Sequence, residues 1–275
     1  MNRKERIQHN LIWGFDAPLR FTYGIDFYPW QKLAARYYVI SSPKLQHTVR
    51  LAVISDLHKS CYGESQRELI ALIRHGKPDA ILFVGDIMEY ARPHPATDCL
   101  LSEMAKQYPC YYVTGNHEFY TDEADAIKSH ISSFGIQVLS GDCVDVILNR
   151  QKLSICGIDD PKIGWEEWKR QLLHVAKAKD DNAFSLLLTH QPSLLEIYSR
   201  FRFDLILSGH AHGGQWRYPF CPHGVFAAGQ GFLPEYTGGI YRCNCSKMVV
   251  NRGLAKNIIP RFGNPPEVSF IKLIG

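Results

Sequence analysis

The sequence lacks the long apolar run that a membrane-spanning helix needs, which is roughly 18 residues, so it predicts no membrane span. Residues Met1 to Arg6 are basic, but no apolar stretch typical of a signal peptide follows them. The formal net charge is only +4, too mild for a nucleic-acid-binding surface, so we expect no nucleic-acid partner. Internal repeats and low-complexity segments are absent, and the composition is that of an ordinary globular protein.

Cysteine pairs with the spacing of a metal module or redox motif are also missing. The eight cysteines are scattered, form no Cys-x-x-Cys pair, and several lie in apolar runs. We therefore expect reduced thiols in a cytoplasmic protein rather than a disulfide framework. One alternative stays open, a small structural zinc site, although the spacing of its ligands matches no common zinc module. That site would use Cys221, His223, Cys243 and Cys245.

The composition and the hydrophobic pattern of the chain change near Thr48. Residues 1–47 are an N-terminal extension in which aromatic residues gather between Leu11 and Ile40. This extension either packs on the body of the protein or rests on a membrane interface as a basic and aromatic surface. We expect a cytoplasmic location, with peripheral contact at the inner face of the membrane under the second interpretation.

From Thr48 onward, hydrophobic periodicity predicts alternating strands and helices. Strands are expected at 50–55, 80–84 and 110–113, and helices at 64–75, 96–107 and 121–133, the last with Thr121 as its N-cap. Later strands are expected at 144–148, 153–158, 184–189, 205–208, 248–251 and 268–273, with helices at 168–178 and 193–198. The predicted fold class is α/β, with two packed sheets and helices outside.

Polar side chains stand at the carboxyl ends of five of these strands, where α/β sheets collect their ligand sites. In chain order they are Asp56 with His58, Asp86, Asn116 with His117, His190, and His210 with His212. Asp56 and His58 are two residues apart, so an extended backbone would aim both to one side. Carboxylate, amide oxygen and imidazole together suit Mn, Fe or Zn. The set is too large for one tetrahedral ion and fits two ions that share a carboxylate, roughly 3.5–4 Å apart.

Each of these residues also has an ordinary structural explanation. Asp56 would cap a helix, Asp86 and Asn116 would occupy turns, and His190 would be a buried structural histidine. Those explanations would have to hold at five strand ends in succession. The ordered set therefore favours a shared metal site.

The blocks Asp56-x-His58, Gly85-Asp86, Gly115-Asn116-His117-Glu118, His190 and Gly209-His210-x-His212 resemble the signature of the calcineurin-like metallophosphoesterases. The later segments 229–241, 251–254 and 265–268 resemble a bacterial branch of membrane-associated phosphodiesterases, some of which cleave the pyrophosphate of UDP-diacylglucosamine. The resemblance implies a four-layer αββα fold of two mixed sheets flanked by helices, with residues 48–275 as the catalytic domain. It also implies one metal held by Asp56, His58, Asp86 and His212, and a second held by Asp86, Asn116, His190 and His210.

The resemblance further implies a metal-bound hydroxide as nucleophile and His117 as the group that stabilises or protonates the leaving oxygen. His117 would need an orienting carboxylate, and the family's spacing places Glu89 in that role. Glu118 is the rival, but as the next residue on a strand end it would point elsewhere. The predicted catalytic pair is therefore His117 and Glu89.

Tyr90 departs from the family's protein phosphatases, which carry at this position an arginine that grips a phosphomonoester. Arg92 or Arg252 would have to replace that clamp. We therefore expect a phosphodiesterase or pyrophosphatase acting on a small or lipid-linked substrate, with a phosphomonoesterase as the alternative. A non-catalytic scaffold would be expected to have lost ligands, and every ligand position is filled here.

Overall fold

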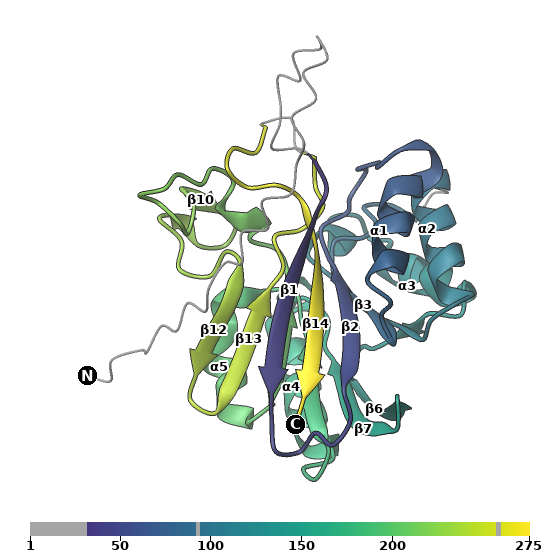
Figure 1. Cartoon of the computed structure of the whole chain (residues 1–275), viewed down its shortest axis with the longest axis vertical. Coiled ribbons are helices and arrows are strands. Elements are labelled where there is room, and N and C mark those ends of the chain that lie inside the picture. Colours follow the sequence, from purple (N-terminus) through teal and green to yellow (C-terminus); the bar gives the residue numbers. More distant parts are fainter. Residues whose placement is uncertain (1–31, 92–93, 257–259) are drawn as a thin grey trace.

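A computed structural model describes residues 32–91, 94–256 and 260–275, and its longer strands form two six-stranded sheets (Figure 1). The first sheet has the order β1-β14-β2-β3-β4-β5 and the second β12-β13-β9-β8-β7-β6. The first consists of β1 (Ala34–Ser41), β2 (Val49–Ile54), β3 (Ala80–Val84), β4 (Cys110–Val113), β5 (Gln137–Val138) and β14 (Glu267–Ile274). The second consists of β6 (Asp142–Leu148), β7 (Gln151–Gly157), β8 (Phe184–Leu188), β9 (Leu205–Ser208), β12 (Gly239–Cys243) and β13 (Ser246–Val250).

Helices and short turns complete the described chain, together with a small hairpin of β10 (Phe226–Ala227) and β11 (Gly231–Phe232). The α-helices are α1 (Arg67–His75), α2 (Pro95–Ala105), α3 (Ala124–Ser133), α4 (Trp165–Ala178) and α5 (Leu195–Tyr198). Single 3-10 turns occur at η2 (Glu64–Gln66), η3 (His117–Phe119), η4 (Pro161–Ile163), η5 (Pro192–Leu194), η6 (Ser199–Phe201) and η7 (His212–Gly214). No helix in these ranges is long and apolar enough to cross a bilayer.

Alternation along the strands builds four layers. Leu51 and Val53 of β2 face the second sheet, in one apolar cluster with strand residues such as Leu207. Their neighbours Ala52 and Ile54 face the other way and pack with α1, α2 and α3. The outer face of the second sheet packs against α4 and α5. Figure 1 shows α1 to α3 gathered on one side of the molecule, away from α4 and α5. The predicted α/β architecture of two packed sheets flanked by helices is confirmed.

The parallel strands place the polar strand ends at one edge. β2, β3, β4 and β5 pair in parallel, and so do β7, β8, β9 and β13. Backbone hydrogen bonds join neighbouring loops, from the Asp56 N–H to the Gly85 carbonyl (3.0 Å) and from the Gly209 N–H to the His190 carbonyl (3.1 Å). The two sheets meet where the His210 N–H donates to Asp56 Oδ1 (3.0 Å).

The described part of the N-terminal extension belongs to the first sheet. β1 pairs in parallel with β14 along its whole length and forms an edge of that sheet. Residues 1–31 lie outside the described residues, so the predicted membrane contact there stays a prediction. The predicted N-cap at Thr121 is wrong, because α3 begins at Ala124 with Glu123 at the N-cap position.

The prediction of reduced thiols is wrong for one pair of cysteines. Cys143 and Cys156 form a disulfide, while the six other cysteines are free. Cys143 on β6 lies directly opposite Cys156 on β7 in an antiparallel hairpin. The hairpin turns at Asn149 and Arg150, both with positive φ, as a two-residue connection requires. Two cysteines equidistant from that turn were the overlooked signal.

Candidate metal centre

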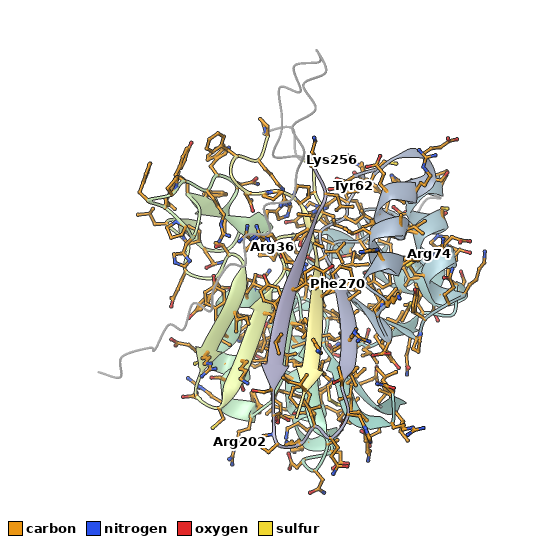
Figure 2. All side chains as sticks on the ribbon, in the orientation of Figure 1. Arg36, Tyr62, Arg74, Arg202, Lys256 and Phe270 are labelled. Carbon is orange, nitrogen blue, oxygen red and sulfur yellow. A yellow bond between two sulfur atoms is a disulfide. The ribbon has the colours of Figure 1, made fainter. Side chains whose placement is uncertain are left out.

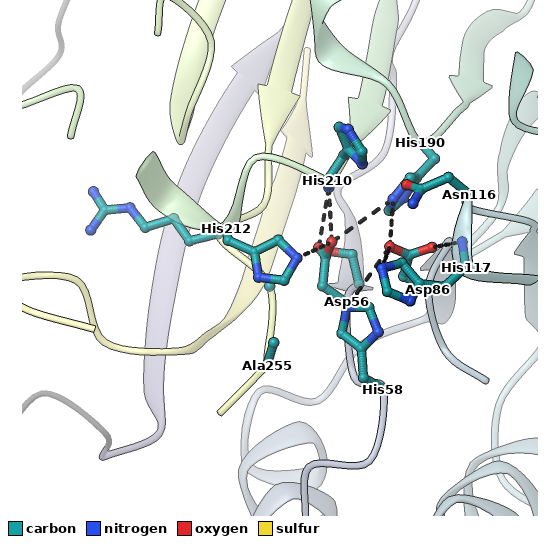
Figure 3. Close-up of polar contacts among 12 residues, drawn as sticks. Asp56, His58, Asp86, Asn116, His117, His190, His210, His212 and Ala255 are labelled. Atoms are coloured by element: carbon teal, nitrogen blue, oxygen red, sulfur yellow. Dashed lines mark hydrogen bonds and ion pairs between the residues drawn. The ribbon is translucent and has the colours of Figure 1, made fainter. Parts of the chain in front are cut away.

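All seven predicted metal-ligating residues come together at the edge where the two sheets meet (Figure 3). Loops after β2, β3 and β4 contribute Asp56 and His58, Asp86, and Asn116, and loops after β8 and β9 contribute His190, and His210 and His212. The first sheet therefore supplies all three oxygen-donating residues and one imidazole, and the second supplies three imidazoles.

Five of these residues adopt left-handed backbone conformations, which explains how they converge. The φ angles are 50° at Asp56, 50° at His58, 54° at Asp86, 65° at His210 and 45° at His212. The expectation that an extended backbone aims Asp56 and His58 together is therefore wrong, since each residue turns sharply instead. Such conformations cost on the order of 1–3 kcal/mol each and cluster at functional sites. The surrounding structure maintains this strain at the ligands.

One group of ligands comprises Asp56, His58, Asp86 and His212, whose ligand atoms lie within 4.8 Å of one another. His212 Nε2 lies 3.3 Å from Asp56 Oδ1, and His58 Nε2 lies 3.8 Å from Asp86 Oδ2. Burial alone would raise the pKa of Asp56, but the adjacent His212 and His190 imidazoles hold it well below its usual range. Asp56 is therefore an ionised acceptor, as a metal ligand must be.

A second group comprises Asp86, His190 and His210. His190 Nε2 lies 3.1 Å from Asp86 Oδ2, and His190 Nδ1 lies 2.8 Å from the Val84 carbonyl oxygen. A carbonyl oxygen can only accept, so Nδ1 carries a proton and Nε2 is the ring nitrogen that faces the site. Burial lowers the pKa of His210 to about 3, which keeps that ring neutral. Neutral imidazole is the form that binds metal.

Asn116 provides the test of whether these residues fit a metal ion. Its Nδ2 donates to the Tyr120 hydroxyl (2.7 Å), which fixes the side-chain amide. Its Oδ1 is buried, and no described residue donates to it. A buried acceptor without a donor is costly, whereas a cation would satisfy it. The amide oxygen, carboxylates and imidazoles form a donor set that fits Mn, Fe or Zn.

His117 and Glu89 lie at the more open side of the site. His117 Nε2 is 4.0 Å from Asp86 Oδ2, and its Nδ1 is 3.7 Å from Glu89 Oε1. The same Glu89 oxygen lies closer to His58 Nδ1, at 3.3 Å, and the other Glu89 oxygen is 2.6 Å from Lys59 Nζ. The adjacent His58 imidazole, aided by Lys59, lowers the pKa of Glu89 to about 2. Glu89 therefore serves both imidazoles.

Glu118, the rival for that role, is fully buried and faces the backbone. Its two carboxylate oxygens accept from four backbone N–H groups at 2.8–3.1 Å, those of Asp86, Ile87, Met88 and Gly115. It joins the loops after β3 and β4, both of which carry ligands. Sequence reasoning missed this role, because an acid that binds backbone leaves no spacing signal.

The alternative zinc site is not assembled. Within the described ranges, no group of three or more ligating side chains contains a cysteine. Cys221 Sγ donates to the Gly224 carbonyl instead, and Cys243 Sγ to Ser199 Oγ.

Arg92, one of the two arginines considered as a phosphate clamp, lies outside the described residues. Ser55 and Asn251 were not predicted, yet Asp56 Oδ2 and Asn251 Oδ1 both lie within hydrogen-bond distance of the single Ser55 hydroxyl donor.

Several known proteins are similar to this chain in sequence, and others are similar to it in fold. YkuE of Bacillus subtilis, an uncharacterized metallophosphoesterase, is 30% identical over 231 residues, 82% of this chain and 78% of that protein. Phosphodiesterase YaeI of Escherichia coli is 27% identical over 235 residues, 82% of each protein.

Among solved structures, phosphopantetheinyl hydrolase of Mycobacterium tuberculosis has a TM-score of 0.52 at 10% identity, covering 74% of this chain and 89% of that chain. Thermus thermophilus SoxB, a sulfate thiohydrolase, has a TM-score of 0.51 at 15% identity, covering 82% of this chain but 56% of that chain. At these identities the likeness concerns the fold alone. Residues 49–214 match the family Calcineurin-like phosphoesterase. The chain belongs to the calcineurin-like phosphoesterases.

Proposed function

We propose that this metallophosphoesterase uses two divalent metal ions to cleave phosphodiester or pyrophosphate bonds. The observation that carries the proposal is that two separate ligand groups share Asp86. Asp86 is 1% exposed, and its Oδ2 faces His190 while its Oδ1 accepts from the His117 N–H (2.9 Å). A buried carboxylate in this position suits a bridge between two ions.

Divalent ions at such a site lower the pKa of coordinated water and neutralise charge on phosphoryl oxygens. His117 has a side chain 33% exposed at the edge of the ligand cluster, where a leaving oxygen can reach it. Asp86 fixes the His117 backbone, and Glu89 lies beside its Nδ1, so Nε2 is left to serve the leaving oxygen. Positioning of this kind, together with electrostatic stabilisation, accounts for almost all of the catalysis in phosphoryl transfer.

The environment of Tyr90 favours a diester over a phosphomonoester. Tyr90 is 45% exposed, and Lys59 Nζ lies 4.9 Å above its ring. Lys59 is itself engaged by Glu89 (2.6 Å), so the described residues at this position offer no planar clamp for a dianionic phosphate. This supports a phosphodiesterase more than the phosphomonoesterase alternative.

An apolar loop beside the site supports a substrate with a lipid portion. Gly229, between β10 and β11, lies so close to the site that a Cβ there would be 3.2 Å from His210 Nε2. The flanking side chains of Phe232 and Leu233 are 78% and 76% exposed. Adjacent exposed apolar residues commonly mark a ligand or membrane contact. A lipid-linked diester would place its apolar part there.

The proposal is tested with full-length protein, several added metals, and paired mono- and bis-aryl phosphates. We expect faster hydrolysis of the bis-aryl ester and a loss of about 10²–10⁴ in turnover for His117→Ala with bound metal largely kept. Asp86→Asn should lose both ions in elemental analysis. Full turnover in His117→Ala would remove its assigned role, and two ions still bound to Asp86→Asn would contradict the bridge.

A further inference from the structure

Four arginines gather around one buried carboxylate next to the metal centre. Arg36 comes from β1, Arg217 follows η7, Arg252 follows β13, and Arg261 precedes β14, whose first residue is Glu267. We call these four side chains the arginine cluster. Figure 2 shows Arg36 beside the upper part of β1.

The single carboxylate is shared rather than paired. Arg36 Nε and Arg252 Nε each lie 3.5 Å from Glu267 Oε2, and neither forms a hydrogen bond with it. Glu267 is fully buried, and its Oε1 accepts from Ser269 Oγ (3.0 Å). One carboxylate oxygen therefore lies near two guanidinium groups without accepting a hydrogen bond from either Nε.

The other two arginines are more deeply buried and keep unused donors. Arg217 is 8% exposed, and its Nη2 donates to Thr237 Oγ1 (2.9 Å). Arg261 is 2% exposed and, among the described residues, donates to carbonyl oxygens from Nε (2.9 Å) and Nη1 (2.7 Å). Arg217 Nε and Arg261 Nη2 are buried, and no described residue accepts from them. Burial, together with the Arg252 charge, lowers the pKa of Arg217 to about 10, so like charges are crowded here.

This charge balance points to a missing anion. Arg36 and Arg252 share the Glu267 carboxylate, and its charge also acts on the buried Arg217 and Arg261. Buried charges are costly unless they are paired. Tyr38, which also lies among these groups, stays neutral because burial, then the Glu267 charge, raises its pKa well above the usual range. Guanidinium forks match the oxygens of a phosphoryl group in bidentate geometry.

The arginine cluster adjoins the metal centre on the side of His212. Gly253, next to Arg252, packs so closely that a Cβ there would be 2.6 Å from Asp56 Cβ. Asn264, three residues after Arg261, donates from Nδ2 to the His212 carbonyl oxygen (2.8 Å). An anion bound by the cluster would therefore neighbour a phosphoryl group held at the metals.

We propose that the arginine cluster is a second anion subsite, which binds one phosphoryl group of a diphosphate while the other lies at the metal centre. The inference rests on the proposed function and narrows its substrate to diphosphate diesters. Hydrolysis would consume one water, break one bridging P–O bond as the new P–O bond forms, and release two phosphomonoesters and two protons. No further reactant is required.

The test separates the two subsites by removing metal with a chelator. Inorganic pyrophosphate is titrated calorimetrically into metal-free, full-length protein and into the variants Arg217→Gln, Arg217→Lys and Arg242→Gln. Arg242 is exposed on β12 and is the matched control. We expect Arg217→Gln to weaken pyrophosphate binding at least about tenfold, the typical effect of losing a charge-assisted hydrogen bond. Arg217→Lys should recover part of the affinity because it keeps the charge, and Arg242→Gln should bind like the parent protein.

A second measurement compares UDP-glucose with bis(4-nitrophenyl) phosphate in metal-loaded protein. The ratio of kcat/KM for the diphosphate over the simple diester should fall about tenfold or more in Arg217→Gln. If Arg217→Gln does not fold, Arg36→Gln at the more open edge strand takes its place. Metal-free protein that fails to bind pyrophosphate, or a variant that binds it unchanged, overturns the subsite even if aryl ester hydrolysis succeeds. If binding depends on Arg217 while no ester is hydrolysed, the subsite stands and the proposed function fails.

Discussion

Replacing Gly85 with alanine tests whether a contact between the two sheets positions the ligands. Gly85 has a φ of +89°, and a Cβ built there would lie 2.3 Å from His190 Nδ1 and 2.8 Å from the Gly115 Cα. Gly135, after α3, has nearly the same φ of +88°, yet a Cβ there would meet nothing within 4 Å. The two glycines share the backbone strain and differ only in the contact.

The expected energies follow from that difference. Alanine in a left-handed conformation costs roughly 1–2 kcal/mol, and both variants incur this cost. In Gly85→Ala the imidazole of His190 must also move, which breaks its hydrogen bond to the Val84 carbonyl at 2.8 Å. A lost hydrogen bond that leaves a buried group unsatisfied costs about 1–3 kcal/mol more. We therefore expect about 1–2 kcal/mol of destabilisation for Gly135→Ala and about 2–5 kcal/mol for Gly85→Ala.

Calorimetric unfolding and elemental analysis together measure both effects. At about 2–4 °C per kcal/mol, Tm should fall by roughly 2–8 °C in Gly135→Ala and roughly 4–20 °C in Gly85→Ala. His190 is a predicted metal ligand, so Gly85→Ala should lower the affinity for metal about 10–100-fold, whereas Gly135→Ala should not. Elemental analysis should therefore find less bound metal in Gly85→Ala alone. Equal Tm values for the two variants, or unchanged metal content in Gly85→Ala, would refute the reasoning.

Two other predictions concern groups that sequence reasoning missed or misjudged. Glu118→Ala leaves four backbone N–H groups without their acceptor, and Glu118→Gln retains one accepting oxygen, so unfolding Tm should decrease from parent to Gln to Ala. If the Gln and Ala variants melt together, Glu118 does not act through these hydrogen bonds. Reduction of the Cys143–Cys156 disulfide, which closes a sequence separation of 13 residues, should cost about 2–3 kcal/mol and lower Tm by about 4–12 °C. Mass spectrometry of unreduced peptides should find the linked pair, and its absence would contradict the assignment.

Much of the fold was predictable, because buried strands appear in the sequence as runs of apolar residues. β3, β4 and β9 begin and end where the apolar runs do, and each is buried along its whole length. β1 was missed because its exposed positions carry Tyr37 (65% exposed) and Val39 (58% exposed), so polar and apolar residues do not alternate along its sequence. It also lies within an aromatic-rich segment. Its partner is β14, far away in sequence, so no local signal marks it as an edge strand.

The residues of the candidate metal centre could be named from the sequence, but their geometry could not. Their order at strand ends depends only on which strands are parallel, and that was readable. Left-handed conformations at Asp56 and His58 are imposed by long-range contacts, such as the hydrogen bond from the His58 N–H to the Asp86 carbonyl (3.1 Å). The arginine cluster has the same origin, since Arg36 and Glu267 are brought together only by the pairing of β1 with β14. Spacing rules do not reach across such distances.

Neither sheet alone supplies a complete ligand set, which links the chemistry to folding. The first group needs His212 from the second sheet, and the second group needs Asp86 from the first. The apolar cluster between the sheets includes Leu51 and Leu207. It therefore sets the separation of the predicted ligands, although its apolar side chains offer no ligand atoms. A metal ion that binds both halves stabilises the packed state by mass action, by about 2.7 kcal/mol at one hundred times its Kd. Substitutions that truncate side chains of this cluster should accordingly weaken metal binding. Added metal should restore part of the lost stability.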